Sequence, residues 1–370
     1  MTSKRAKYVM IGGFLGAGKT TAVGRLAKRL TERGLKVGLI TNDQSTGLAD
    51  TSILRARGFE VQEIAGGCFC CRFASLAEAA ENLEADGRPD VILAEPVGSC
   101  TDLVATVSYP LRRIYGDRYR IAPLSVLVDP TRARRLLGLI EGRDFSEKVR
   151  YVFEKQLEEA DRIVVNKSDL LQPAELEELL LALRERYKNT AVLAVSAKDG
   201  AGTDAWFDGL LEDEVEPAPT MDVDYKVYAE GEALLGWYNA SVKLEADKRF
   251  DANELLQDFA ARSQAALQDA DVEIAHLKAT LDTGGQLAAI SLVSSDGDAD
   301  LREALVDGAL AGDLILNLRA ETKAEDLARV ARAALAACLK TRPQLRATFE
   351  HEDYFQPSPP VPTHRDAVSS

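Results

Sequence analysis

The stretch "KYVMIGGFLGAGKT", residues 7–20, decides the fold of the first part of this chain. Its first half is a short apolar run, typical of a strand buried on both faces. Its second half, Gly13–Thr20, matches G-x-x-x-x-G-K-[ST] in full, and a helical pattern follows it. In a loop of this kind, backbone N–H groups and the positive end of a helix face phosphate groups. The stretch therefore predicts a nucleotide-binding domain.

Apolar runs continue to alternate with amphipathic stretches along the first part of the chain. The expected strands lie at 7–13, 36–43, 59–64, 90–96, 123–130, 161–167 and 191–197. Two of the helical patterns between them, 20–34 and 75–87, close on a glycine, as helix C-termini often do. This alternation predicts an α/β fold, a mostly parallel P-loop NTPase sheet with helices on both faces.

The alternation of apolar and amphipathic stretches ends near residue 213, where an acidic stretch with two prolines reads as a linker. Beyond it the patterns run strand, helix, strand, strand, strand, helix, which predicts a small α+β domain, with a ferredoxin-like order as one arrangement. The expected division is a P-loop GTPase domain at 1–212, a linker at 213–222, a C-terminal α+β domain at 223–345 and a Pro-rich tail at 346–370.

The composition excludes several classes of protein. The chain has 370 residues, a formal net charge of −14 and a pI of about 4.9, which argues against nucleic acid or an anionic membrane as a default partner. No segment approaches the roughly 20 apolar residues of a membrane span, and the start does not read as a signal peptide. We therefore expect a cytoplasmic protein, in a compartment that keeps thiols reduced.

The phosphate-binding loop assigns roles to its side chains. Lys19 is expected to reach the β- and γ-phosphates, and the Thr20 hydroxyl to ligate Mg²⁺. The residues expected to hold the phosphates are Gly13, Gly16, Ala17, Gly18, Lys19, Thr20 and Thr21.

The base is indicated by "IVVNKSD", which places Asn166, Lys167 and Asp169 after a strand as N-K-x-D. A carboxylate at Asp169 can accept from both N1–H and the exocyclic amine of guanine, and adenine offers no such pair of donors. The next strand is followed by "SAK", where Ser196 and Ala197 are expected to form a second base-contacting loop. These motifs predict that the nucleotide is GTP.

Acidic residues at strand ends are candidates for the metal side of the nucleotide. Glu95 ends an apolar strand, where it could hold Mg²⁺ through water or orient the attacking water. Asp43 ends another strand at the same edge of a parallel sheet. Together with Lys19 they form the expected catalytic set, whereas Asp129, which precedes a proline, reads more readily as a cap.

Three of the five cysteines, Cys68, Cys70 and Cys71, form a C-x-C-C cluster behind two glycines. The cluster lacks the paired C-x-x-C of a closed four-thiolate site, so an open metal site with three thiolates is expected. The fourth position is left to water, to Glu63 or to a partner's residue, and the thiolates favour Zn²⁺ or a similar ion. Buried or redox-prone thiols remain the alternative.

Other candidates are weaker. Cys100 could approach the nucleotide or the thiol loop, although a lone cysteine there is more often a small core residue. Cys338 lies on the apolar face of the last helical pattern and is expected in a core. His351 and His364 flank a tail that could fold back over a site.

The succession "GFLGAGKTT", "GGCFCC", a strand ending in Glu95, and "NKSD" resembles the CobW family of GTPases, relatives of the urease and hydrogenase maturation GTPases. The resemblance covers roughly residues 6–210. It implies that Cys68, Cys70 and Cys71, with Glu63 near them, bind Zn²⁺, Co²⁺ or a similar ion, and that GTP hydrolysis is coupled to metal loading and release. The chain departs from the family in "NDQSTGLAD", where Asp43 replaces a usual glutamate, and in "EPVG", where many members read "ETTG".

The leading hypothesis is a Mg²⁺-dependent GTPase that carries a transition metal to a client metalloenzyme. An alternative is a GTP-dependent chaperone that loads or reactivates a corrinoid enzyme, with thiols that contact the client or its cofactor. A third is a redox-sensing GTP switch with a reversible disulfide. A homodimer that joins two thiol loops stays open.

Overall fold

The structure is a computed structural model that describes residues 5–42, 49–85, 87–212 and 220–366. The chain forms two compact units, each assembled from segments that are distant in sequence. Unit 1 comprises Met1–Gln44, Phe59–Tyr228 and Pro360–Ser370, and unit 2 comprises Ser45–Gly58 and Ala229–Pro359.

Unit 1 is built on a parallel sheet of eight strands in the order β3-β2-β4-β1-β6-β7-β8, with β5 also paired to β1. The strands are β1 (Ala6–Gly13), β2 (Val37–Asn42), β3 (Val61–Ile64), β4 (Val91–Glu95), β5 (Tyr119–Ile121), β6 (Ser125–Val128), β7 (Arg162–Val165) and β8 (Ala191–Ala194). All seven expected strands are confirmed. The one that sequence patterns missed, β5, has only three residues, too few to show a periodicity.

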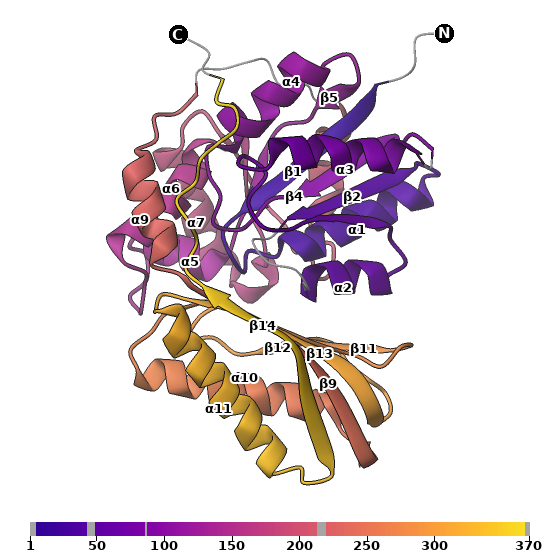
Figure 1. Ribbon diagram of the computed structural model, residues 1–370. Helices are drawn as coiled ribbons and strands as arrows, with labels where there is room; N and C mark the ends of the chain where they lie inside the picture. The colour runs from indigo at the N-terminus through magenta and orange to yellow at the C-terminus, as the bar shows by residue number, and fades with distance from the viewer. Residues whose placement is uncertain (1–4, 43–48, 86, 213–219, 367–370) are drawn as a thin grey trace. The chain divides into compact units, whose positions relative to one another are not determined.

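Helices lie on both faces of this sheet, so that α1 and α3 flank the strands β1, β2 and β4 in Figure 1. The helices of unit 1 are α1 (Lys19–Glu32), α3 (Phe73–Ala85), α4 (Tyr109–Tyr115), α5 (Pro130–Leu136), α6 (Glu147–Glu158), α7 (Pro173–Arg186) and α8 (Thr203–Glu212), with a π-helical turn η1 (Val104–Ser108) and a 3₁₀ turn η2 (Ser168–Leu170). A further helix, α9 (Tyr225–Ala233), begins in unit 1 and ends in unit 2. The mostly parallel P-loop sheet predicted from the sequence is therefore present, and the carboxyl ends of its strands carry the motifs.

Unit 2 is an antiparallel sheet in the order β12-β11-β10-β13-β9-β14. Its strands are β9 (Gly236–Phe250), β10 (Ile274–Asp282), β11 (Leu287–Leu292), β12 (Asp300–Glu303), β13 (Ala309–Ala320) and β14 (Leu345–Phe355), and its two long helices are α10 (Ala252–Asp269) and α11 (Ala324–Lys340). The strands β9, β10, β13 and β14 with α10 and α11 follow the β-α-β-β-α-β order of ferredoxin-like domains, which β11 and β12 extend at one edge.

The two faces of the second sheet are covered differently. Leu277 and Leu318, paired across β10 and β13, join the apolar core that includes residues of α10 and α11. Their neighbours Lys278 and Asn317 point to the opposite face because side chains alternate along a strand. That face is contacted by helix α2 (Ala49–Ala56), since the Ala49 N–H donates to Asn317 Oδ1 over 2.9 Å.

Three segments lie elsewhere than the sequence suggested. Helix α2 falls within the range 1–212 given to the first domain, but it belongs to unit 2. The strand β14 occupies the start of the expected tail; its sequence is mostly polar because it lies at the edge of the sheet, paired to β9 alone. Residues 360–366 belong to unit 1 again, and residues 213–219 of the expected linker lie outside the described residues.

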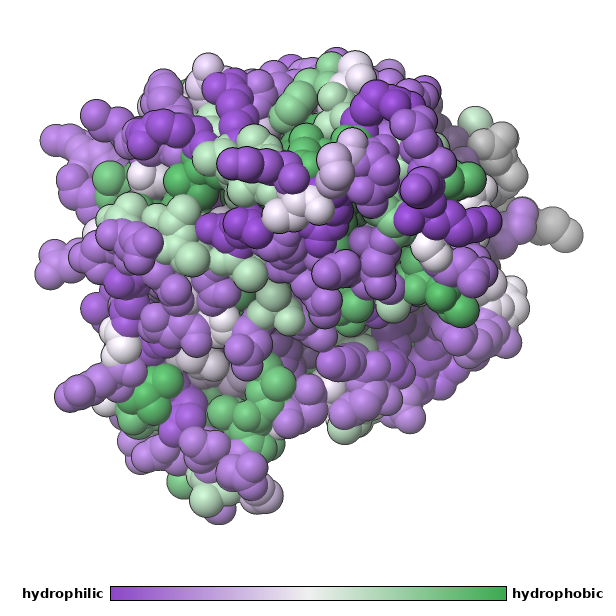
Figure 2. All heavy atoms as spheres, turned by 90° about the horizontal axis from the view of Figure 1, so that it is seen from below, coloured by the Kyte–Doolittle hydropathy of each residue, from purple (hydrophilic) through white to green (hydrophobic). Residues whose placement is uncertain are grey.

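The surface carries mostly hydrophilic side chains on the face drawn in Figure 2, where apolar ones form separate small groups. Large exposed apolar side chains of unit 2 include Val306, Leu310 and Phe349. Among the described residues, no helix combines the length and the apolar character needed to cross a bilayer.

Candidate functional site: a phosphate-binding loop and a thiol cluster

The loop from β1 into α1 has a backbone that only glycine tolerates at several positions. Gly13, Gly16 and Gly18 have positive φ angles of 130°, 79° and 90°. A Cβ atom on Gly13 would lie 2.2 Å from the carbonyl oxygen of Leu127, and one on Gly18 would lie 2.3 Å from Nδ2 of Asn166. Both distances are shorter than any van der Waals contact, so the glycines let the loop turn against its neighbours.

Lys19 and Thr20 open α1 and point in defined directions. The Lys19 ammonium donates to the carbonyl oxygens of Gly13 (2.8 Å) and Phe14 (3.3 Å), so it lies across the loop that precedes it. The Thr20 hydroxyl donates to Oε1 of Glu95 at the end of β4 over 2.9 Å. A hydroxyl and a carboxylate are thus adjacent at the N-terminus of α1, and both are oxygen ligands that suit Mg²⁺. Thr21, the next residue expected to contact phosphate, lies in the same first turn.

Asp43, the second expected acid, lies outside the described residues, directly after β2. The residue before it ties β2 to the thiol loop. Asn42 Nδ2 donates to the carbonyl oxygens of Ile64 (3.0 Å) and Gly67 (2.7 Å).

Asn166 joins three loops of the expected nucleotide site. Its Nδ2 donates to the carbonyl oxygen of Ala17 in the phosphate-binding loop over 2.8 Å. Its Oδ1 accepts from the backbone N–H of Ala197 over 2.9 Å. The side chain is buried at the end of β7, so it acts as a fixed brace between the two loops.

Lys167 adopts a left-handed backbone with a φ of 56° and forms an ion pair of 2.8 Å with Asp129. Asp129 also caps α5, because its Oδ1 accepts from the N–H groups of Thr131 and Arg132. Burial would raise the pKa of Asp129, but the Lys167 ammonium outweighs it and holds that pKa below the usual value. The interpretation of Asp129 as a cap is therefore confirmed.

Asp169 and Ser196 lie in the two loops that Asn166 connects. Asp169 is exposed in η2, with its carboxylate available to a ligand, whereas Ser196 is fully buried. The second loop is anchored to α1 by Arg25, whose guanidinium donates to the carbonyl oxygens of Ala197 (2.8 Å) and Lys198 (2.6 Å).

The three clustered thiols lie together. The Sγ–Sγ distances are 2.9 Å for Cys68 and Cys70, 3.1 Å for Cys68 and Cys71, and 3.7 Å for Cys70 and Cys71. All three sulfur atoms lie within 4.8 Å of one another. Cys68 and Cys70 are buried and Cys71 is partly exposed, so the cluster opens toward solvent on the Cys71 side.

A tight turn before α3 produces this convergence. Gly66 and Gly67 have positive φ angles of 76° and 147°. The carbonyl oxygen of Cys68 then accepts from the N–H groups of Cys71 (3.1 Å) and Arg72 (2.9 Å). The backbone is thereby closed into one turn, which aims three side chains at one point.

Hydrogen bonds among the thiols shift their pKa values in opposite directions. Hydrogen bonds from the thiols of Cys100, Cys70 and Cys71 hold the pKa of Cys68 well below its usual value. Hydrogen bonds with Cys100 and Cys68 raise the pKa of Cys70, and the one with Cys68 raises the pKa of Cys71 to about 11.

Glu63, the other expected metal ligand, does not belong to this cluster; among the described residues the group comprises the three cysteines alone. It lies on β3, in register with Thr41 of β2, which in turn pairs with Glu95 of β4. Glu63 therefore lies on the strand itself, before the turn that gathers the thiols.

Two features near the cluster had little or no signal in the sequence. The thiol of Cys100 hydrogen-bonds with those of Cys68 and Cys70, whereas the sequence allowed Cys100 to lie near the nucleotide, near the thiol loop or in the core. Residues 360–366, here called the strap, lie along the thiol loop: Thr363 N–H donates to the Cys70 carbonyl oxygen (2.8 Å) and Val361 N–H to Cys71 Sγ (3.3 Å). The strap also places the His364 ring edge-on to Phe73, with centroids 4.9 Å apart. Backbone hydrogen bonds of this kind leave no sequence pattern.

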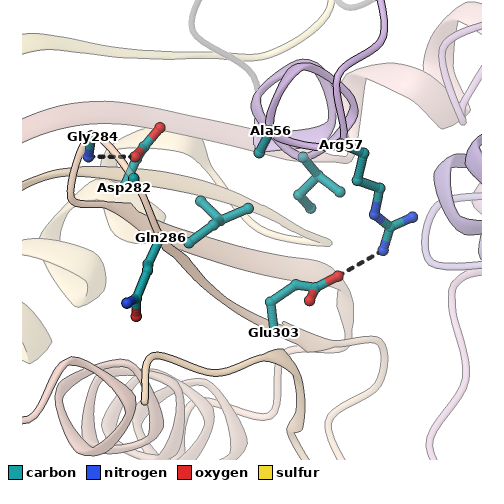
Figure 3. Close-up of a pocket in the computed structure, with 9 residues that line it drawn as sticks. Ala56, Arg57, Asp282, Gly284, Gln286 and Glu303 are labelled. Atoms are coloured by element: carbon teal, nitrogen blue, oxygen red, sulfur yellow. Dashed lines mark hydrogen bonds and ion pairs between the residues drawn. The ribbon is translucent and has the colours of Figure 1, made fainter. Parts of the chain in front are cut away.

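A separate pocket of about 410 Å³ lies within unit 2 (Figure 3). Its charged groups already have partners, because Glu303 forms an ion pair of 2.8 Å with Arg57 and Asp282 accepts from the Gly284 N–H over 2.8 Å. The phosphate-binding loop, the N-K-x-D motif and the C-x-C-C cluster all lie in unit 1, so this pocket is not part of the candidate site.

The chain is similar to several known proteins. The zinc chaperone CobW of Sinorhizobium sp is 29% identical over 224 residues, which cover 54% of this chain and 62% of that protein. The zinc chaperone YeiR of Escherichia coli strain K12 is 32% identical over 167 residues, which cover 44% of this chain and 47% of that protein. The matched region thus spans less than two thirds of either relative. The crystal structure of the Zn(II)-bound YjiA GTPase from E. coli aligns with a TM-score of 0.37 and 18% identity, over 90% of this chain and 99% of that one.

A family model described as the nucleotide-binding domain of CobW/HypB/UreG matches residues 7–193, half of the chain. The matched range includes the phosphate-binding loop, the thiol loop and the N-K-x-D motif whose geometry is described above. The chain therefore belongs to the CobW/HypB/UreG family of P-loop GTPases.

Proposed function

We propose that this protein is a GTP-binding and GTP-hydrolysing metallochaperone, which binds a transition metal through Cys68, Cys70 and Cys71 and delivers it to a client metalloenzyme. The observation that carries the proposal is the convergence of three sulfur atoms within 4.8 Å, in the same compact unit as a complete phosphate-binding loop. Two relatives named as zinc chaperones support Zn²⁺ as the cargo, with Co²⁺ as the close alternative.

The thiol cluster fits such an ion with a small expansion. Zn–S bonds of about 2.3 Å in a tetrahedral site place the sulfur atoms about 3.8 Å apart. The Cys70–Cys71 distance of 3.7 Å already meets this value, and the other two distances need to widen by less than about 1 Å. A site with three sulfurs keeps one position open, which suits an ion that has to leave.

The nucleotide site fits GTP. The exposed carboxylate of Asp169 is available to the two donors of guanine, and Asn166 braces its loop against the phosphate-binding loop. Lys19, at the N-terminus of α1, would exchange its contacts with loop carbonyl groups for the β- and γ-phosphates. Its charge stabilises the negative charge that develops there during hydrolysis.

Thr20 and Glu95 are the residues that would hold Mg²⁺, which neutralises phosphate charge when it is bound. Glu95 accepts the Thr20 hydroxyl and is buried, so its carboxylate is held close to where the γ-phosphate would lie. From this position it would also orient the attacking water. Like other switch GTPases to which no catalytic group is supplied by a partner, the isolated protein is expected to hydrolyse GTP slowly.

A cobalt titration tests the metal arm of the proposal. The reduced protein is titrated with Co²⁺ in the presence of GDP or of a non-hydrolysable GTP analogue, and the thiolate-to-cobalt absorption band is followed. The Cys68, Cys70 and Cys71 to Ser triple variant should lose the band, whereas Cys338→Ser, a change of a buried thiol in α11, should keep it. Absence of the band from the unmodified protein in both nucleotide states contradicts metal carriage and favours the corrinoid-enzyme alternative.

The nucleotide arm is tested separately by hydrolysis. Lys19→Ala should abolish measurable GTP turnover, and an excess of ATP should not compete with GTP in the unmodified protein. Unchanged turnover in Lys19→Ala, or equal competition by ATP, would contradict the assignment of the site.

A further inference from the structure

Cys100 contributes a fourth thiol to the cluster from a different part of the chain. Its side chain is 1% exposed, and its thiol hydrogen-bonds with those of Cys68 and Cys70. The three clustered cysteines come from the turn before α3, whereas Cys100 lies after β4. A small core residue would face apolar side chains only, so these two sulfur contacts distinguish Cys100 from an ordinary buried cysteine.

The backbone around Cys100 is held in place by a buried amide. Gln156 of α6, 1% exposed, donates through Nε2 to the carbonyl oxygens of Gly98 (2.9 Å) and Cys100 (2.8 Å). The Cys100 N–H donates to the Val97 carbonyl oxygen over 3.0 Å. These hydrogen bonds fix the backbone turn that carries the Cys100 thiol.

The same segment begins at the phosphate-binding loop. Glu95 accepts the hydroxyl of Thr20, and a Cβ atom on Gly98 would lie 3.0 Å from the backbone nitrogen of Leu15 and 2.8 Å from its side chain. Residues 95–100 therefore run from the expected Mg²⁺ and γ-phosphate position to the thiol cluster. Cys100 lies only five residues after Glu95, so a change in the backbone at Glu95 is expected to shift Cys100 as well.

We propose that Cys100 is a detachable fourth sulfur ligand of the metal site, whose engagement is set by the nucleotide through residues 95–100. This inference rests on the proposed function. Cys100 is not one of the three cysteines whose sulfur atoms all lie within 4.8 Å of one another, so a site with four sulfurs requires a rearrangement of Cys100 or of the cluster. Four thiolates make a closed tetrahedral site that retains Zn²⁺, and three leave the open position that transfer requires. In this proposal the fourth thiol comes from outside the C-x-C-C motif, and the three thiolates of the motif remain the open site expected from the sequence.

The first experiment compares two single thiol variants. Cys100→Ser and Cys338→Ser are titrated with Co²⁺ in the presence of GDP or of the non-hydrolysable GTP analogue. In the nucleotide state that binds the metal more tightly, Cys100→Ser should lose about one quarter of the charge-transfer intensity and at least about tenfold in affinity, since even outer-sphere partners of a metal contribute tenfold or more. The difference between the two nucleotide states should also shrink in Cys100→Ser and persist in Cys338→Ser.

The second measurement needs no variant. Zinc X-ray absorption of the unmodified, zinc-loaded protein counts the sulfur neighbours in each nucleotide state. Four sulfurs in one state, and three with one lighter atom in the other, support the proposal. Four in both states would retain Cys100 as a ligand but overturn its detachment.

The failures of the two proposals are distinguishable. Three sulfurs in both states, together with a Cys100→Ser titration equal to that of the unmodified protein, overturn the role of Cys100 and leave the metallochaperone intact. An unmodified protein that binds neither Co²⁺ nor Zn²⁺ overturns both.

Discussion

The Thr20 hydroxyl donates a hydrogen bond of 2.9 Å to Oε1 of Glu95, joining the first turn of α1 to the end of β4. These two residues are far apart in sequence and belong to different motifs. Their contact places the threonine of the phosphate-binding loop beside the acid expected to face the γ-phosphate.

Glu95→Gln keeps the shape of the side chain and removes its charge. We expect GDP affinity to stay within about threefold of the original, because Glu95 would act on the metal side of the γ-phosphate, whereas GTP turnover should fall at least about tenfold. Single-turnover hydrolysis with excess protein measures the change. Turnover equal to that of the unmodified protein would remove Glu95 from the site.

Asn166→Ala deletes the brace between the phosphate-binding loop and the second base loop. Two buried backbone groups, the Ala17 carbonyl and the Ala197 N–H, lose their partner, so the free energy of unfolding should fall by about 1–3 kcal/mol. Affinity for GTP and GDP should fall together, since both loops are expected to contact the nucleotide.

A matched control exists in unit 2. Asn253 makes the same pair of contacts, donating to the Leu305 carbonyl oxygen (2.8 Å) and accepting from the Leu305 N–H (2.9 Å). Asn253→Ala should lower stability without changing nucleotide affinity, as measured by titration with a fluorescent guanine nucleotide. If both variants lose nucleotide affinity equally, the effect is one of general stability, and the brace is not specific.

Glu159 makes stability depend on pH. Burial and, to a smaller extent, the charge of Asp102 raise its pKa to about 8, although hydrogen bonds from Val104 N–H and the Thr101 hydroxyl oppose this. Asp102 in turn forms an ion pair with Arg365 and accepts a hydrogen bond from the Tyr225 hydroxyl. Since the pKa in the unfolded chain is about 4.3, the folded state holds the extra proton between these values. The free energy of unfolding is therefore highest at low pH. It falls as the pH rises from about 4.3 toward 8, by up to about 1.4 kcal/mol per pH unit.

Glu159→Gln removes this titration. Its free energy of unfolding, measured by denaturant titration from pH 5 to pH 8, should fall less steeply with pH than that of the unmodified protein. Parallel pH profiles would show that Glu159 is ionised in the folded state.

The strap is expected to shield the thiols. Thr363 N–H and Oγ1 donate to the carbonyl oxygens of Cys70 and Cys71, and Arg365 forms an ion pair of 2.7 Å with the buried Asp102. A chain ending at residue 359 loses these contacts. The rate at which a thiol reagent modifies Cys71 should then rise at least about threefold, because local opening no longer has to break them.

Arg365→Ala tests the same point with a single change. It should raise the rate of modification in the same direction but less than the truncation, as followed by mass spectrometry of the Cys71 peptide. Modification of Cys338 in unit 2 serves as the internal reference. An unchanged Cys71 rate in the truncated chain would show that the strap does not protect the cluster.

Much of the fold could be predicted because its signals are local. A buried parallel strand needs a continuous apolar run, and a phosphate-binding loop needs glycines at fixed spacing, so β1, the loop and α1 are all visible in residues 7–34. The order of unit 2 was visible for the same reason, except for the short β12 and the polar edge strand β14. Glu63 lies outside the group of three thiols because it is on β3, before the turn that gathers them, and its role as a metal ligand stays a prediction.

The sequence by itself determined the parallel P-loop sheet, the N-K-x-D motif and the C-x-C-C cluster, since each depends on residue types at close spacing. The tertiary structure alone decided which distant residues meet: Thr20 with Glu95, Cys100 with the clustered thiols, α2 with the second sheet, and the strap with the thiol loop. These contacts use single side chains and backbone hydrogen bonds. Such groups carry no periodicity, so only the folded chain brings them together.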